Sequence, residues 1–502
     1  MLKKVINNLV PVIGCSLFIL CLWIAILNLF KVSPYLAPGT VTIPIGILFL
    51  TVIIISVYSE MDKIITWLKK RKKLLLYGVI SLFIIGLVAR ISFLMLTYVP
   101  ISDPGNNYEI ANLLFTNGNL YENANEYYAR YVAIFPHLYA YGAILSLSFK
   151  LFGSGFLAVI ILNTIFDIIA TFSLYYLVKA IFKKRNLSLL AAMFWWLSPF
   201  NIIFCSVILP VVIVNASILL ALVVIMHIFK KIEKLGALLP LSFVAGLALF
   251  FQNIMRPFAI ILIFSILAYY ILYFIKHSKF IVFRNCLVSL SVIVGVFMYS
   301  NSVFQEKIAQ VTGYPVNHTT QAWSIFVGSN YESIGRWNAV DKDNLHQTVT
   351  ELGLNEGLHK LQSEGISRWK KLGTYQAANL LFYKSAVIAG DQRDMIYNII
   401  DYKYFNFYEY PERETRFSTV SDICKLYWFA IMALVMIYTF KTKLRKELNF
   451  MSFLSIFTIL LFLVSLLLEA SSRYFATFLP TFVLMAVAGI NELLKSTKTI
   501  KA

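Results

Sequence analysis

Asp103 is the residue of this chain whose type and position are best suited to chemistry. It lies in the short segment Tyr98–Tyr108, directly after an apolar run long enough to cross a membrane. A carboxylate placed where a helix leaves the bilayer can accept a proton from a hydroxyl group. Because Asp before Pro-Gly is also a common turn former, the position alone leaves a purely structural role equally open.

Three arginines are suited to binding a phosphate near Asp103. Arg90 lies near the outer end of the preceding apolar run, where a cation is costly and is a functional candidate by default. It can also extend its guanidinium group to the membrane surface. Arg256 and Arg473 are isolated basic residues in very short connections. Guanidinium groups bind phosphate through paired hydrogen bonds. The alternative for these two is a local pair with Glu469 or contact with lipid headgroups.

A second group of polar and aromatic residues is suited to contacting a sugar. Tyr108 and Glu109 follow Asp103 in a stretch with helical periodicity, and Trp337 lies in a segment that mixes aromatic, amide and acidic side chains. For the residues of the segment around Trp337, packing within the folded loop is the alternative. The candidate substrate-binding residues are Arg90, Tyr108, Glu109, His137, Arg256, Trp337, Asn338, Arg473 and Tyr474, with Asp103 as the catalytic candidate.

The elements that must position these residues are membrane helices. The chain is 59% hydrophobic and only 14% charged, which excludes a soluble globular protein. Its apolar runs are continuous and not alternating, so they predict helices and not a β-barrel. We predict an all-α polytopic membrane protein with about 12 transmembrane helices, at 9–30, 41–58, 74–97, 156–181, 187–207, 209–229, 238–254, 257–275, 281–300, 423–440, 449–468 and 474–493.

The distribution of charge predicts the orientation in the membrane. The net charge is +19, and the basic clusters lie in short connections, which is typical of cytoplasmic loops and not of a nucleic-acid partner. The clusters are Lys69–Lys73, Lys183–Arg185, Lys230–Lys231, Lys276 with Lys279, and Lys441–Lys446. With twelve spans, all of them and both termini lie in the cytoplasm and Asp103 lies outside the plasma membrane. This holds only if the apolar segment 134–152 rests at the outer interface without crossing.

The same topology predicts four regions. Residues 1–73 form an N-terminal helix pair with a basic cytoplasmic loop, and 74–300 form a membrane module whose first outer loop is 98–155. Residues 301–422 form an extracytoplasmic helical loop domain, and 423–502 hold the last membrane helices. The five cysteines lack metal-ligand spacing, and no nucleotide-binding motif occurs. This argues against an ATP-driven pump and against a cytoplasmic nucleotide-sugar donor.

These residues, in this order, resemble the integral-membrane GT-C glycosyltransferases, in the family-39-like branch of the protein O-mannosyltransferases and the lipid A aminoarabinose transferase. The likeness covers about 74–275 and 449–493, and each motif is short. It is carried by Ala89-Arg90, Ser102-Asp103-Pro104 with Tyr108 and Ala111, Phe135–Tyr139, Leu151–Gly153, Asn163, Ser198-Pro199, Arg256-Pro257, Glu469, Arg473-Tyr474 and Pro480.

The resemblance implies a GT-C-type helical bundle that transfers a sugar, with inversion, on the outer face. The implied partners are a polyprenyl-phosphate-sugar donor, held by the outward arginines, and a glycan, teichoic-type polymer or glycolipid acceptor, together with membrane lipids. It also implies that Asp103 is the base. Many relatives have a second acid beside this aspartate and another near 207–212, both missing here. No cofactor is therefore expected, and a divalent metal is possible but not supported. Asp103 must act alone or with Glu109, Glu122 or Glu126.

Two other functions fit the same features. One is a polymerase or ligase of lipid-linked oligosaccharides, which would tolerate loss of Asp103 if its base lies in 301–422. The other is a non-enzymatic flippase or transporter of lipid-linked glycans. A transporter predicts charges in the middle of membrane helices, of which Asp167 is the clearest example.

Overall fold

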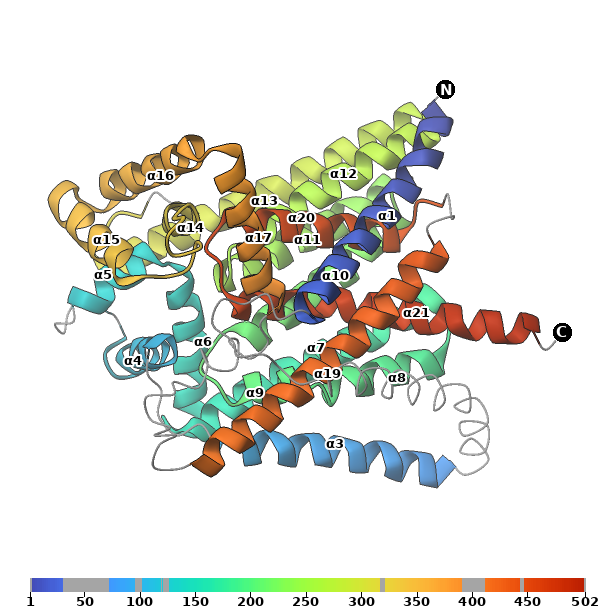
Figure 1. The fold of residues 1–502 in the computed structure, drawn as a ribbon, viewed down its shortest axis with the longest axis horizontal. Helices are drawn as coiled ribbons and strands as arrows, with labels where there is room; N and C mark the ends of the chain where they lie inside the picture. Colours follow the sequence, from blue (N-terminus) through green and yellow to red (C-terminus); the bar gives the residue numbers. More distant parts are fainter. Residues whose placement is uncertain are drawn as a thin grey trace.

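The computed structural model describes residues 2–29, 72–94, 102–118, 120, 126–316, 321–390, 411–442 and 447–500, and the regular elements in these ranges are all helices (Figure 1). The long ones are α1 (Leu2–Leu29), α3 (Lys72–Leu94), α7 (Phe156–Phe182), α8 (Arg185–Trp196) with α9 (Pro199–Cys205), α10 (Val211–Lys230), α11 (Leu235–Met255), α12 (Ala259–His277), α13 (Phe280–Thr312), α19 (Pro411–Thr442), α20 (Phe450–Leu467) and α21 (Leu479–Ile500). The protein is thus an all-α, multi-span membrane protein.

The predicted spans can be compared with the structure only within the described residues. Among the described residues, eight helices are long and apolar enough to cross a membrane, or up to ten if each of two bent pairs is one span. Two further apolar helical stretches, Leu9–Ala25 in α1 and Tyr77–Ser92 in α3, are shorter than a full span within the described residues. The predicted span at 41–58 lies outside the described residues. One bent pair is α8 with α9, which turns by 49° before Pro199, where a backbone N–H is missing.

The predicted interfacial segment 134–152 is divided between two helices. Glu126–Ile134 forms α5, and α6 (His137–Phe152) leaves it at 119° after Phe135-Pro136. In Figure 1, α6 runs across the direction of α3. The location of α6 relative to the lipid stays a prediction, but its first residue, His137, now has a defined place at a sharp bend.

The segment around Asp103 is the start of a helix and not a loop. Helix α4 (Ser102–Asn117) has Asp103 and Pro104 in its first turn. Aspartate is favoured there because its carboxylate can accept hydrogen bonds from the free backbone N–H groups of the first turn. Proline is tolerated because a backbone N–H at this position would have no acceptor within the helix. Helix α4 packs against α6, where Gly142 lies so close to Ile110 that an added Cβ would approach its Cγ2 to 2.6 Å. The sequence expectation of a loop aspartate is therefore corrected.

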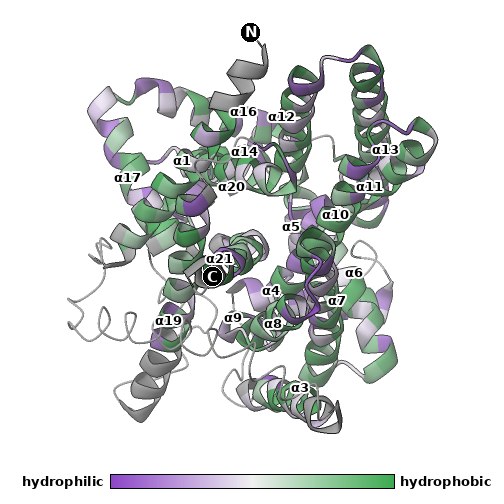
Figure 2. Ribbon diagram, turned by 90° about the vertical axis from the view of Figure 1, so that its right-hand side faces the viewer, coloured by the Kyte–Doolittle hydropathy of each residue, from purple (hydrophilic) through white to green (hydrophobic). Residues whose placement is uncertain are grey.

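Four further helices cover one end of the long helices. They are α14 (Gln321–Gly328), α15 (Ala339–Leu352), α16 (Leu354–Lys371) and α17 (Thr374–Gly390). Helix α13 passes the predicted boundary at 300 without a break and ends at Thr312. In Figure 1, α14–α16 lie at the end opposite both termini. A separate apolar core that includes Trp323, Phe326 and Leu358 holds α14–α16 together. Figure 2 shows hydrophobic residues along α11–α13 and more hydrophilic ones on α16.

Candidate functional site

A cavity of about 450 Å³ opens where the ends of the long helices meet α14 and α15. The connection between α11 and α12 contributes Arg256, and the connection after α20 contributes Glu469, followed by the 3-10 helix η2 (Ser472–Phe478) with Arg473 and Tyr474. Asp103 enters from the first turn of α4. Side chains from distant parts of the sequence therefore converge on one polar cavity at the end of an apolar bundle.

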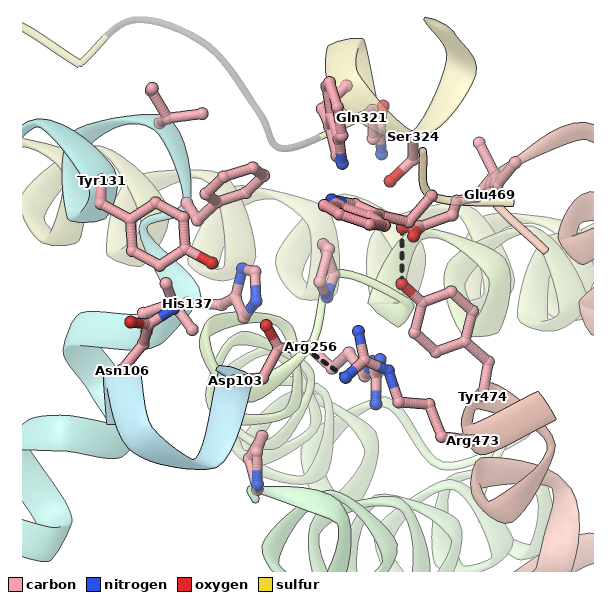
Figure 3. Close-up of a pocket in the computed structure, with 18 of the residues that line it drawn as sticks. Asp103, Asn106, Tyr131, His137, Arg256, Gln321, Ser324, Glu469, Arg473 and Tyr474 are labelled. Carbon is pink, nitrogen blue, oxygen red and sulfur yellow. Dashed lines mark hydrogen bonds and ion pairs between the residues drawn. The ribbon is translucent and has the colours of Figure 1, made fainter. Parts of the chain in front are cut away.

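An ion pair lies at the centre of this cavity. The Nη1 atom of Arg473 donates a hydrogen bond to Oδ2 of Asp103, 370 positions away in the sequence (Figure 3). The Arg473 guanidinium holds the pKa of the Asp103 carboxyl below its usual range, and the charge of Arg256 contributes in the same direction. Asp103 is therefore ionised at neutral pH. Both side chains stay partly exposed, so a ligand that enters the cavity can reach them.

The second arginine is held against an aromatic ring. The Cζ atom of Arg256 lies 4.2 Å from the centroid of the Tyr474 ring, a cation–π distance. The Tyr474 hydroxyl donates to Oε2 of Glu469 over 2.7 Å, which fixes the orientation of the ring. Burial lowers the pKa of Arg256, but a guanidinium group stays charged at neutral pH. The cavity thus contains two guanidinium groups, one of which is tied to Asp103.

Glu469 lies at the site, although the sequence indicates it only as a possible partner of an arginine and as one residue of the family resemblance. In the structure Arg473 pairs with Asp103, while the buried Glu469 carboxyl accepts a hydrogen bond from Tyr474. Burial raises the pKa of Glu469. It is the second acid on the cavity wall, in place of the sequence candidates Glu109, which is exposed, and Glu126, which Tyr314 contacts. Glu122 lies outside the described residues. The available sequence signal for Glu469 was its position, four residues before the isolated Arg473.

His137 lies on the same wall. Burial, with the charge of Arg256 second, lowers the pKa of His137 to about 3, so the imidazole is neutral at physiological pH. Its Nδ1 atom is buried and has no hydrogen-bond partner among the described residues. A neutral ring with a free polar atom can accept or donate one hydrogen bond to a ligand. The described residues contain no group of three or more His, Cys, Asp or Glu side chains that could hold a metal ion.

A buried lysine joins the outer helices to this site. The Nζ atom of Lys384 in α17 donates to the carbonyl oxygens of Gly328 at 2.7 Å and of Leu468 at 2.5 Å. Burial lowers the pKa of Lys384 to about 7. A Cβ added at Gly328 would lie 2.4 Å from the Leu468 carbonyl carbon, so the contact depends on this glycine. The segment that carries Glu469 is therefore fixed against α14 and α17.

Arg90 lies away from the cavity, inside the membrane bundle. Its guanidinium is fully buried, pairs with Asp167 of α7, donates to the carbonyl oxygen of Gly86 over 2.7 Å and stacks on Trp196 at 3.9 Å. The other oxygen of Asp167 accepts from Trp195 over 2.8 Å. Arg90 thus does not extend to the surface, and its contacts join α3, α7 and α8. We do not include it in the site proposed below.

The Arg90–Asp167 pair gives a prediction about stability. Removing one member of a buried ion pair costs about 3–5 kcal/mol because the remaining charge is uncompensated. Arg90→Met should therefore unfold well below the wild-type temperature in a thermal scan of the purified protein in detergent. The double variant Arg90→Met/Asp167→Asn should recover at least half of the loss. A single variant as stable as the wild type would contradict this role.

Three other sequence candidates also lie outside the cavity, and one lies on it. The Tyr108 hydroxyl donates to the carbonyl oxygen of Ser154 over 2.9 Å, and Glu109 is exposed on α4. Asn338 caps α15 by accepting from the backbone N–H of Asp341 over 2.8 Å. Trp337, in contrast, lines the cavity and is 57% exposed. The structure therefore brings together Asp103, His137, Arg256, Trp337, Arg473 and Tyr474.

Comparison with known proteins adds little to this geometry. No family model and no curated protein match the chain. Among solved structures, it is similar to the crystal structure of ArnT from Cupriavidus metallidurans bound to undecaprenyl phosphate, with 12% sequence identity and a TM-score of 0.35. The match covers 82% of this chain and 78% of that one. A similarity this low supports no inference about function.

Proposed function

We propose that the protein is a glycosyltransferase that moves a sugar from a polyprenyl-phosphate donor to an extracytoplasmic acceptor of the cell envelope. One observation carries the proposal: an ionised carboxylate, Asp103, and two guanidinium groups, Arg256 and Arg473, converge in one cavity at the end of a membrane bundle. A lipid phosphate lies at this depth of the membrane, where its prenyl chain stays in the apolar phase. Arginine is the preferred partner of a phosphate.

The donor phosphate is proposed to lie between Arg256 and Arg473. Leu209, Pro210 and Phe258 form the neighbouring apolar wall, which suits the first prenyl units. Sugar transfer releases this phosphate with an additional negative charge. Fixed cations in a cavity shielded from bulk water stabilise such charge most strongly as it develops. The two arginines would therefore accelerate the reaction as well as bind the donor.

Asp103 is proposed as the general base. It takes the proton of an acceptor hydroxyl, whose oxygen attacks the anomeric carbon from the side opposite the phosphate. A new carbon–oxygen bond forms, the bond from the anomeric carbon to the phosphate oxygen breaks, and the configuration is inverted. The proton passes from Asp103 to solvent, and the lipid phosphate leaves with the bonding electrons. This balance requires no metal and no further reactant.

The ion pair with Arg473 gives a prediction about pH. In the free protein this pair lowers the pKa of Asp103. A donor phosphate that competes for Arg473 removes the cation from Asp103 and adds an anion, so the pKa of Asp103 rises in the complex. Activity is lost as pH falls through that pKa. We therefore expect the acid limb of kcat at a higher pH than that of kcat/KM for the donor.

Full pH–rate profiles of transfer measure this difference. Glu469 also has a raised pKa, so the profiles are repeated with Glu469→Gln, which should keep the displacement between the two limbs. Coincident acid limbs in the wild type would show that donor binding leaves the Asp103–Arg473 pair intact.

The function itself is tested with the purified protein in nanodiscs and a panel of polyprenyl-phosphate sugars. The expected result is release of free polyprenyl phosphate together with a glycosylated acceptor, or slow hydrolysis when no acceptor is present. If intact donors bind and move between leaflets of proteoliposomes without any cleavage, the proposal fails and the protein is a transporter.

A further inference from the structure

One wall of the cavity has no role in the chemistry proposed above. It consists of α14 and α15 with the turn between them, and it faces the two arginines across the cavity. Figure 3 shows Gln321 and Ser324 on this wall, on the opposite side of the cavity from Asp103 and Arg473. The polar and aromatic residues of this wall that line the cavity are Gln321, Trp323, Ser324, Trp337, Lys342 and His346.

The polar side chains of this wall lack partners within the described part of the protein. The side chains of Gln321, Ser324, Lys342 and His346 make no hydrogen bond to any described residue, and 57% of the Trp337 surface is exposed. The opposite wall of the cavity differs, because there Arg473 is paired with Asp103. An amide and a hydroxyl beside an exposed indole are typical of surfaces that bind a sugar or polyol.

The wall is also positively charged along one edge. Lys342 and His346 are four positions apart on α15, so they lie on the same face of the helix. Arg130 of α5 donates to Thr350 Oγ1 over 2.7 Å, which places a further cation one turn along. Burial and the charges of Lys342 and Arg130 keep His346 neutral at physiological pH, with Asp343 opposing them. Lys342 and Arg130 then supply the charge, and His346 supplies a ring N–H.

We infer that α14 and α15 form the acceptor subsite and that the acceptor is a glycan or polyol that carries phosphate or carboxylate groups beside the hydroxyl that is glycosylated. Trp337 packs against the apolar face of the acceptor unit, Gln321 and Ser324 bind its hydroxyls, and Lys342 and His346 bind the neighbouring anion. The inference rests on the proposed function, because it assigns the hydroxyl to Asp103. It explains why cations occur on both walls of the cavity: Arg256 and Arg473 bind the donor, and Lys342 binds the acceptor.

Binding of two matched probes tests this assignment. One is a fluorescent glycerol-phosphate oligomer, and the other is an uncharged polyglycerol with the same number of hydroxyls. They are titrated into the full-length protein in nanodiscs of uncharged lipid that contain polyprenyl phosphate. We expect the charged oligomer to bind about tenfold more tightly, since each charge-assisted hydrogen bond contributes roughly that factor, and to weaken with added salt.

The variants locate the effect. Lys342→Gln/His346→Gln should remove the preference for the charged oligomer, and Trp337→Ala should weaken both probes. Lys360→Gln, an exposed lysine of α16, is the matched control and should change neither. Equal affinity of the wild type for the two probes, or an unchanged preference in the double variant, overturns the inference.

The rate of donor hydrolysis without acceptor separates this inference from the proposed function. Hydrolysis in the wild type and in the control variant Lys360→Gln should be equal. If the wild type cleaves the donor but binds the charged and uncharged probes equally, only the acceptor inference is refuted. Absence of any donor cleavage in the wild type refutes the proposed function as well.

Discussion

Asp103→Asn is expected to lower the rate of sugar transfer by at least about a hundredfold and up to about 10⁴-fold, the range in which a general base contributes. Asparagine has the shape of aspartate and its amide oxygen still accepts a hydrogen bond from Arg473, but it cannot take a proton from the acceptor. Initial rates with the purified variant and a saturating donor measure the loss.

The same substitution should not weaken donor binding. With Asp103 neutral, Arg473 has no competing anion, so the lipid phosphate should bind as tightly as in the wild type or more tightly. Glu356→Gln, a neutralised carboxylate at the exposed start of α16, is the control and should transfer at the wild-type rate. More than a tenth of the wild-type rate in Asp103→Asn would remove Asp103 as the base and favour a polymerase or ligase whose base lies in the outer helices.

Arg473→Gln is expected to have the second largest effect. It removes a cation that we assign to the departing phosphate, a type of interaction whose loss lowers the rate by on the order of 10²–10³-fold. The donor KM should rise while kcat falls, because the cation acts on both the bound donor and the developing charge. Steady-state kinetics with donor concentration varied would separate the two effects.

Arg473→Lys distinguishes charge from mere occupancy. Lysine keeps the charge but cannot form paired hydrogen bonds to a phosphate, so an intermediate rate is expected. Arg185→Gln removes an exposed arginine from the start of α8 at the other end of the bundle and should have no effect. If Arg473→Gln left the donor KM unchanged, Arg473 would serve only to hold Asp103.

Much of the fold could be predicted because membrane helices follow from local composition. Continuous apolar runs identified the long helices, and the split between α8 and α9 lies at Ser198-Pro199, which the sequence shows. Helix α4 was also predictable, since Ser-Asp-Pro is typical of a helix start. The loop assignment gave too much weight to Pro-Gly as a turn. Asn338, three residues before Asp341, is likewise typical of a helix N-cap.

The site could be predicted only in part because its contacts are long-range. The isolated arginines of two short connections, Arg256 and Arg473, both line the cavity, and their binding role stays a prediction. The partner of each cation did not follow from the sequence. The sequence shows Arg90 and Asp167 as charges within apolar runs. It does not show that they pair, because the pairing requires α3 and α7 to lie side by side. Glu469 was expected near Arg473, but the direction of η2 turns Arg473 to Asp103 and leaves Glu469 to Tyr474.

The Asp103–Arg473 pair has a consequence for biosynthesis. Its members are 370 positions apart, so Asp103 is translated long before its counter-ion exists. Until η2 is in place, the nascent protein holds this carboxylate at the membrane surface without the cation that stabilises its charge. The proposed reactive centre therefore forms as one of the last steps of assembly, and we expect a chain that ends before α20 to insert most of its helices without catalysing transfer. Coexpression of the missing C-terminal helices as a separate polypeptide would supply that cation in trans.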